Sequence, residues 1–244
     1  MQVNLIELWH EMLWFARGVV FVLAFMSIWA TTITIRNWWK LRKAQAETRK
    51  FAPEFSQFLE EDNLVEAIKL AEGYKNSHVA RVLGGALGEV KPLIMDGSVT
   101  VADINSAERA VERNMMIITS ELKRGLAVLA TVGSTAPFVG LLGTTMGVVN
   151  AFQGMATSGS GGIAAISSGI SEALITTAFG LLVALPAVWA FNYFTNKIEN
   201  LVVEMTYTSK ELIDYLIRGV SGEFGRSRFT REFDVTGGSG QITT

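Results

Sequence analysis

The chain has 244 residues, of which 49% are hydrophobic and only 18% charged, and its formal net charge is −2. Soluble domains average about a quarter charged residues, so this chain is depleted in charge. Nucleic-acid binding needs a basic surface, and the net charge gives no support for it. The chain has no cysteine and only two histidines, His10 and His78, far apart in sequence, which excludes disulfides and thiolate sites and predicts neither a metal site nor a cofactor.

The first uncharged run, residues 18–35, lies between Arg17 and Arg36. A helix needs roughly 20 apolar residues to cross the hydrocarbon core, so the run is a short but credible span. A cleaved signal peptide is the alternative, but it requires a basic start and a small-residue cleavage site. Here acidic residues precede the run, and arginine, two tryptophans and lysine follow it, as is typical of an anchored helix end. The prediction is an extracytoplasmic segment at 1–17 and a transmembrane helix at 18–35.

The next region, residues 36–125, has the composition of a soluble domain. Positions 36–124 carry 14 Lys or Arg residues and 13 Asp or Glu residues. Apolar residues interleaved with charged ones predict a helix at 57–73, and Gly73 is a plausible stop. We therefore predict a helical domain between the first and second spans.

A second helix of this domain is predicted at 103–124, with Asp103 or Asn105 as the residue that caps its start. No helix breaker separates this helix from the apolar stretch that follows it. The pattern therefore predicts one long helix that continues into the second span.

Two further spans follow Arg124. A loop at 156–163, rich in glycine and serine, divides the uncharged stretch into spans at 126–155 and 164–195. Helical periodicity continues over 196–220, and the last residues, 221–244, have the composition of a disordered tail. The predicted fold class is an all-α integral membrane protein with three transmembrane helices. The second and third continue as long cytoplasmic helices, and a helical cytoplasmic insertion follows the first.

The orientation of the spans follows from the distribution of lysine and arginine, which favour the cytoplasmic side of a membrane. Basic residues cluster after the first span, before the second and after the third. The opposite side has only Arg17 and the uncharged loop at 156–163. The prediction is an N-terminus outside the cytoplasm, with residues 36–125 and the C-terminal part in the cytoplasm.

Small residues recur every three or four positions along the second and third spans, which places them on one face of each helix. Small residues in membrane helices permit close approach of a neighbouring backbone. The simpler interpretation is that these stripes are packing seams whose threonines bond their own backbone carbonyls. The stripe of the second span contains Gly133, Pro137, Gly140, Thr144, Gly147 and Ala151, and that of the third contains Ala173, Thr177, Gly180 and Ala184.

Glu172 is the only charged residue between positions 125 and 196. It lies on a neighbouring face of the third span, together with Thr176, Phe179 and Val183. An ionisable group at membrane depth is costly unless it is paired, hydrated or neutralised, and such groups tend to mark ion or proton pathways. Since Glu172 follows the loop by only about ten residues, a place near the membrane interface, where the cost is small, is the alternative.

The sequence contains no catalytic or nucleotide-binding motif: no Walker loop, no paired-histidine metal signature and no serine nucleophile elbow. The segment GLLGTTMG at 140–147 lacks the lysine of a phosphate loop and lies within a predicted span. The expected protein is therefore not an enzyme. A non-conducting membrane scaffold remains an alternative to a channel, although a scaffold needs neither the threonines nor Glu172.

The second and third spans closely resemble the MotA/TolQ/ExbB proton-channel family, and in particular its ExbB/TolQ branch. The resemblance covers roughly residues 125–195, and the order of one span, a large cytoplasmic insertion and two more spans agrees with it. Mild departures at Thr145, Ser171 and Thr176 do not disturb the pattern. The segments that carry the resemblance are PFVGLLGT at 137–144, GISEALITTAFGL at 169–181 and LPA at 185–187.

This resemblance implies properties that one chain does not show. Members form a pentamer in the bacterial inner membrane around a single-span ExbD- or TolR-like subunit, which carries the proton-binding aspartate. The resemblance places Thr144 and Thr177 on the pore threonines and Glu172 on the glutamate of the third span. Proton flow through such a motor drives work on the cell envelope, in some cases through a TonB-like protein. The driven process stays open among TonB-type uptake, Tol-Pal maintenance and gliding motility.

Overall fold

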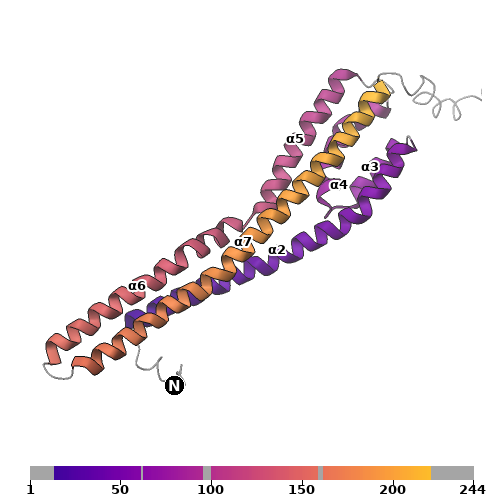
Figure 1. Ribbon diagram of the computed structural model, residues 1–244. Coiled ribbons are helices and arrows are strands. Elements are labelled where there is room, and N and C mark those ends of the chain that lie inside the picture. Colours follow the sequence, from indigo (N-terminus) through magenta and orange to yellow (C-terminus); the bar gives the residue numbers. More distant parts are fainter. Residues whose placement is uncertain (1–13, 62, 96–99, 159–161, 221–244) are drawn as a thin grey trace, which may run out of the picture. The chain divides into compact units, whose positions relative to one another are not determined.

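The computed structural model describes residues 14–61, 63–95, 100–158 and 162–220. Within these ranges every regular element is a helix, which confirms the predicted all-α fold (Figure 1). The predictions for residues 1–13 and for the tail at 221–244 lie outside the described residues. The helices are α2 (Trp14–Glu60), α3 (Leu64–Gly73), α4 (His78–Met95), α5 (Val101–Lys123), α6 (Leu126–Ser158) and α7 (Gly162–Val220).

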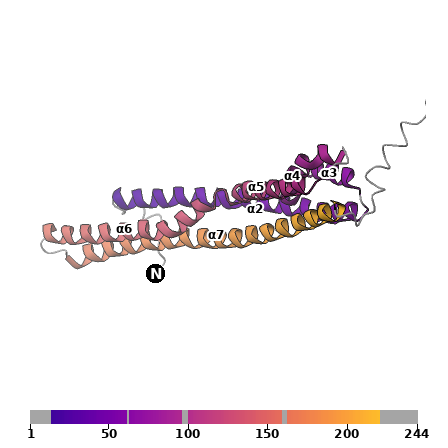
Figure 2. The same ribbon diagram turned by 90° about the horizontal axis from the view of Figure 1, so that it is seen from above.

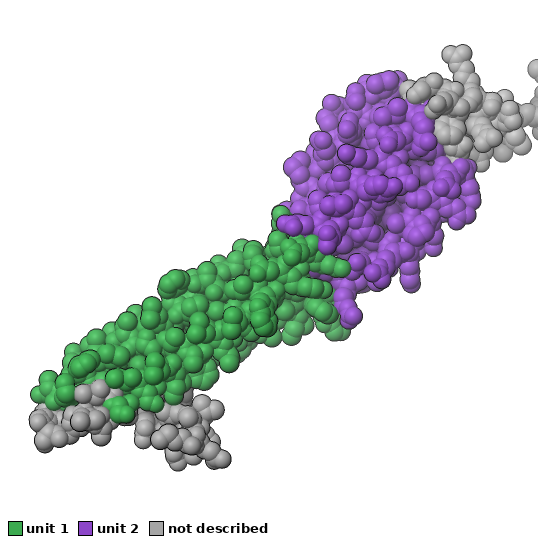
Figure 3. Space-filling view, viewed as in Figure 1, with its two compact units in different colours: residues 1–39, 123–197 green, residues 40–122, 198–244 purple. Residues whose placement is uncertain are grey.

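The chain divides into two compact units, which Figure 3 colours separately. Unit 1 comprises residues 1–39 and 123–197, and unit 2 comprises residues 40–122 and 198–244. Helices α2 and α7 contribute residues to both units. The division falls close to the borders that the charge pattern predicts between the spans and the helical domain.

The three predicted spans lie within α2, α6 and α7, and three helical stretches are long and apolar enough to cross a membrane. In their most apolar windows only 22%, 33% and 28% of the residues are buried. A water-soluble bundle would place such residues in its core. Apolar side chains that face outward over these lengths are instead suited to lipid or to other membrane helices.

An aromatic pair connects α2 and α7 at one end of the first span. The rings of Trp38 and Tyr193 stack with their centroids 5.7 Å apart and an interplanar angle of 24°. Tryptophan and tyrosine favour the membrane interface because they combine an apolar ring with a polar group. The helix end predicted after residue 35 is wrong, because α2 continues to Glu60; only the apolar run ends near this pair.

The helix predicted at 57–73 is in fact two helices. Helix α2 extends over 47 residues and ends at Glu60, and α3 begins after Asn63, whose side-chain oxygen accepts a hydrogen bond from the backbone N–H of Glu66 at 3.2 Å. Asparagine is a preferred cap because its side chain satisfies one of the N–H groups that a helix start leaves without a partner. The predicted stop at Gly73 is confirmed.

The single long helix predicted from residue 103 into the second span is wrong at one place. Helix α5 ends at Lys123 and α6 begins at Leu126, and Gly125 between them has φ of +93°. L-residues with a side chain rarely adopt such a value. A Cβ atom at this position would also lie 2.7 Å from Nη2 of Arg36 and 3.1 Å from a methyl carbon of Ile33, so α2 restricts the space for a side chain at the break.

Helix α5 starts at Val101, two residues before the predicted start, so Asp103 lies in its first turn and neither Asp103 nor Asn105 precedes it. The backbone N–H and the hydroxyl of Thr100 donate to the Asp103 carboxylate at 2.9 and 2.6 Å. These hydrogen bonds favour the charged carboxylate and lower the pKa of Asp103 below its usual value. The loop predicted at 156–163 is also shorter than expected, since α6 extends to Ser158 and α7 starts at Gly162.

A buried polar chain links α2, α4 and α7 in unit 2. The His78 ring is 1% exposed, with Thr48 Oγ1 3.0 Å from its Nδ1 and Glu204 Oε2 3.2 Å from its Nε2. Thr48 Oγ1 also lies 2.8 Å from Ser77 Oγ, which accepts from the N–H of Ala80. Every group has a partner if Ser77 donates to Thr48, Thr48 donates to Nδ1 and Nε2–H donates to Glu204. This network requires a neutral ring, so His78 is a structural residue.

We expect this network to make unit 2 less stable in mild acid. Burial lowers the pKa of His78 below 6.5, although the Glu204 carboxylate opposes the shift. The unfolded chain therefore binds the proton more readily, and the contribution to stability, complete above pH 6.5, is lost as pH falls through the folded pKa. Thermal unfolding of the detergent-purified protein between pH 7.5 and pH 5.5 measures this loss. The His78→Gln variant should lose about half as much thermal stability or less over the same interval, because its amide does not titrate; equal losses would contradict the assignment.

Candidate functional site

Helices α6 and α7 lie side by side in unit 1 (Figures 1 and 2). Their backbones come closest at Gly140 and Gly180. A Cβ atom added at Gly140 would lie 2.8 Å from the carbonyl oxygen of Thr176 and 3.2 Å from the Cα of Gly180. One added at Gly180 would lie 2.7 Å from the carbonyl oxygen of Ala136. Neither position has space for a side chain, because the atoms that it would meet belong to the backbone.

The stripes predicted on the two helices therefore face each other along one seam within a single chain. A Cβ atom at Gly147 would lie 2.9 Å from Cβ of Ala173, and the seam continues beyond this pair, where Ala151 faces Gly169. At the other end Gly133 faces the larger Val188. Ala184 is buried as well, whereas Pro137 is half-buried. Close packing through small residues is the usual way in which membrane helices associate.

The two predicted threonines meet at this seam. Thr144 Oγ1 donates to the carbonyl of Leu141 at 2.7 Å, and Thr177 Oγ1 lies 3.5 Å from Thr144 Oγ1, a long contact in which Thr177 donates. Both side chains are half-buried. The pair thus brings two hydroxyl groups together at a partly open edge of the seam, and each oxygen keeps acceptor capacity for water or another donor.

Thr176 is a seam residue that the sequence placed on a neighbouring face. Its side chain is fully buried, and its hydroxyl lies 2.7 Å from the carbonyl of Ala173 and 3.3 Å from that of Gly140. It fills the space above Gly143, where an added Cβ would lie 2.5 Å from Thr176 Oγ1. The spacing of Gly143, three residues after Gly140 and four before Gly147, is the signal that would have found this contact.

Glu172 is buried too, with 8% of its surface exposed. It lies one turn before Thr176 and next to Ala173, and all three side chains are buried. The structure thus brings Glu172, both predicted threonines and the two stripes to the same pair of helices. A buried carboxyl group in a membrane helix is costly and for that reason tends to be functional.

A family model described as the MotA/TolQ/ExbB proton channel family matches residues 72–207. The chain belongs to this family. The matched segment contains all of α5 and α6, and it contains α7 up to Tyr207. The seam between α6 and α7, with Glu172, Thr144 and Thr177, therefore lies within the family's own region.

Curated relatives of this family member belong to the ExbB/TolQ branch. The biopolymer transport protein ExbB of Xanthomonas campestris is 40% identical over 112 residues, which cover 46% of this chain and 44% of that protein. The Tol-Pal system protein TolQ of Pseudomonas aeruginosa is 44% identical over 104 residues, covering 41% of this chain and 45% of TolQ. The ExbB of Salmonella typhimurium is 34% identical over 156 residues, covering 62% of each chain. The chain thus spans about half the length of the first two relatives and somewhat more of the third.

Family membership and the three apolar helices make this chain a membrane protein of the bacterial inner membrane. Helix α2 precedes the matched segment, so the first span rests on its length and composition alone. Among the described residues, no group of three or more histidine, cysteine, aspartate or glutamate side chains is placed to hold a metal ion.

Proposed function

We propose that this chain is a proton-channel, or stator, subunit of an ExbB/TolQ-like motor that converts proton-motive force into mechanical work on the cell envelope. The observation that carries the proposal is the meeting of the Thr144 and Thr177 hydroxyls across the seam; a buried glutamate, Glu172, lies on the same helix as Thr177. Family membership supports it, since the matched segment contains all three residues.

In this proposal the threonines support proton transfer to and from an aspartate on a single-span ExbD- or TolR-like partner. Each hydroxyl donates one hydrogen bond and accepts others. The Thr177 hydroxyl donates to that of Thr144, which donates to the Leu141 carbonyl. Water or the partner's carboxyl can approach the open edge of this pair. The small stripes hold the two helices close enough for the hydroxyls to meet. Glu172 either relays protons or supplies a hydrogen bond that locks adjacent subunits.

The proposed assembly is a ring of five copies around the partner helices, with a TonB-like or other envelope-spanning protein as a further partner. The inward faces of α6 and α7 would tolerate polar groups because they enclose a charged helix and not lipid. The proposed orientation places the N-terminus outside the cytoplasm and unit 2 inside it.

Proton flux into liposomes tests the function directly. The protein, purified with its native membrane partners, should acidify the lumen of vesicles under an imposed proton gradient and membrane potential. Vesicles that contain an unrelated membrane protein at equal density provide the baseline. Flux no greater than this baseline, from a complex shown to contain the single-span partner, would favour the non-conducting scaffold.

Cysteine labelling tests the orientation separately. The chain has no native cysteine, so a cysteine at Ser158, the last residue of α6, should react with an impermeant maleimide in intact spheroplasts. A cysteine at Asn76, an exposed residue of unit 2, should react only after lysis. Because basic residues flank the opposite ends of the spans, labelling contrast of about tenfold is expected. The reverse pattern would overturn the orientation.

A further inference from the structure

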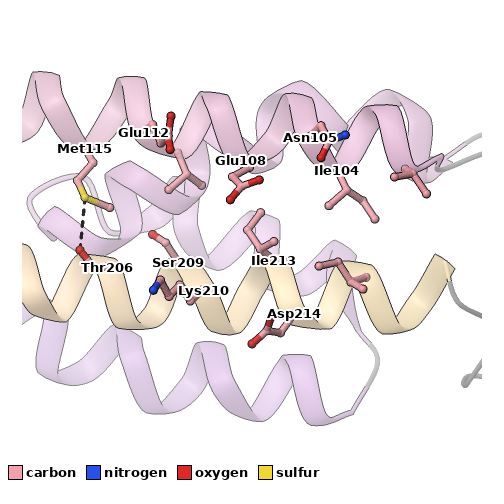
Figure 4. Close-up of a pocket in the computed structure, with 13 residues that line it drawn as sticks. Ile104, Asn105, Glu108, Glu112, Met115, Thr206, Ser209, Lys210, Ile213 and Asp214 are labelled. Atoms are coloured by element: carbon pink, nitrogen blue, oxygen red, sulfur yellow. Dashed lines mark hydrogen bonds between the residues drawn. The ribbon is translucent and has the colours of Figure 1, made fainter.

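A groove of about 800 Å³ runs between α5 and α7 in unit 2 (Figure 4). It belongs to neither the seam between α6 and α7 nor the polar network around His78. This volume lies in the range of pockets that bind ligands in proteins. It is lined along α5 by residues from Val101 to Met115 and along α7 by residues from Thr206 to Ile217.

The floor of the groove is apolar and its rim is acidic. Ile104 and Val111 are buried, and Met115 and Ile213 are half-buried. The exposed rim carries three carboxylates and one ammonium group, which gives it a net charge of −2. None of the three carboxylates forms an ion pair in the part of the chain that the structure describes. A ligand with basic groups around an apolar centre therefore complements this groove. The charged rim residues are Glu108, Glu112, Lys210 and Asp214.

Ser209 points to a polar ligand and not to a hydrocarbon chain. Its side chain, on the wall of the groove, is only 3% exposed, and its hydroxyl has no hydrogen-bond partner among the residues that the structure describes. In Figure 4 it extends from α7 towards α5. A buried hydroxyl without a partner is unfavourable, because it has lost its hydrogen bonds to water. A polypeptide backbone lying in the groove would supply both N–H donors and carbonyl acceptors for it.

The chain itself contains a segment with this chemistry. Residues 226–231 read RSRFTR, with Phe229 among three arginines and no acidic residue. Arginine is well suited to carboxylate partners because its planar group donates paired hydrogen bonds. The segment follows the end of α7 at Val220 by five residues.

The lengths agree as well. The α7 side of the groove, from Thr206 to Ile217, extends for about 16 Å at 1.5 Å per helical residue. Six extended residues span about 20 Å. Five connecting residues reach about 17 Å when extended, enough for the chain to reverse at the Ile217 end. Residues 226–231 can therefore run back along the groove past Asp214 and Glu108 towards Glu112.

We propose that residues 226–231 of this chain dock in the groove between α5 and α7, with Phe229 on the apolar floor and the arginines on the acidic rim. The segment covers an apolar surface of unit 2 and supplies a partner for Ser209. The inference is independent of proton conduction.

Disulfide trapping in the full-length protein tests the docking. A cysteine at Asn105, in the groove, is paired with one at Ser227, and the oxidised yield is measured by mass spectrometry of proteolytic fragments. The matched control pairs Ser227→Cys with Asn76→Cys, because Asn76 is also an exposed asparagine of unit 2 but lies outside the groove. Since docking raises the effective concentration of the tail cysteine at the groove, the Asn105 pair should form at least about tenfold faster than the control.

Charge exchange provides the second measurement. Replacing Arg226, Arg228 and Arg231 by glutamate should slow trapping at least about fivefold, and adding Glu108→Lys, Glu112→Lys and Asp214→Lys should restore it. Equal rates for the Asn105 and Asn76 pairs, or a rate indifferent to charge reversal, would overturn the proposal. A disulfide found only between two chains would overturn it too, by assigning the groove to the tail of another copy. Because no readout here involves protons, these outcomes leave the proposed function unaffected.

Discussion

Valine at both position 144 and position 177 is expected to reduce proton flux through the purified complex at least about tenfold, a lower bound for loss of a proton-transfer group. Valine has nearly the shape of threonine but lacks the hydroxyl. The variant removes the contact between Thr177 Oγ1 and Thr144 Oγ1 while leaving the volume of the seam unchanged. The measurement is luminal acidification of liposomes, with the amount of assembled complex determined on the same sample.

The matched control is Thr131→Val. Thr131 lies on α6 and is exposed, and its hydroxyl donates to the carbonyl of Ala127 at 2.9 Å within the same helix, so loss of that hydroxyl should leave flux within about twofold of wild type. Glu172→Gln tests the remaining polar group: it should impair flux, either as a lost relay or as a lost contact between subunits. A double valine variant that conducts like wild type would return Thr144 and Thr177 to a packing role.

Leucine at Gly140 is expected to abolish the folded seam between α6 and α7 and, with it, the ring. Even a single Cβ at this position would come within 2.8 Å of the Thr176 carbonyl oxygen and 3.1 Å of the Thr177 Cα. Overpacking of a close-packed core costs about 1–3 kcal/mol when side chains can adjust, and here the obstacle is backbone. The cost should therefore lie at or above the top of that range, and the helices should separate.

Native mass spectrometry in mild detergent measures the outcome. Wild type should appear as a ring of five copies, and Gly140→Leu as smaller or aggregated species with a lower unfolding temperature. Gly154→Ala is the control, because this glycine lies on the same helix and a Cβ there meets nothing within 4 Å. A Gly140→Leu variant that assembles like Gly154→Ala would contradict the seam, and a wild-type ring of another size would contradict the pentamer.

Several features of this protein were readable from the sequence because they depend on composition summed over many residues. Each span is an apolar run of about the thickness of a bilayer, and all three lie within α2, α6 and α7. The continuation of the third span is confirmed, since α7 extends without a break over 59 residues. The small stripes were also visible, because a period of three or four residues places them on one helical face.

Features that depend on a neighbouring helix were not readable in this way. One glycine in an apolar helix is tolerated, so the sequence did not predict that Gly125 takes a positive φ, close to Arg36 and Ile33, and separates α5 from α6. The same is true of Thr176, which the helical period placed on a face next to the small stripe and which in the structure packs against Gly143 in the seam.

The candidate site shows the same division. The sequence by itself determined the spans, the helical class, the family and the identity of Thr144, Thr177 and Glu172, because each of these is a property of one segment. Only the tertiary structure decided that the two stripes face each other within one chain, that the threonine hydroxyls come within 3.5 Å, and that Glu172 is buried. The physical reason is that a helical period specifies which residues share a face, whereas the partner of that face depends on how closely two backbones can approach.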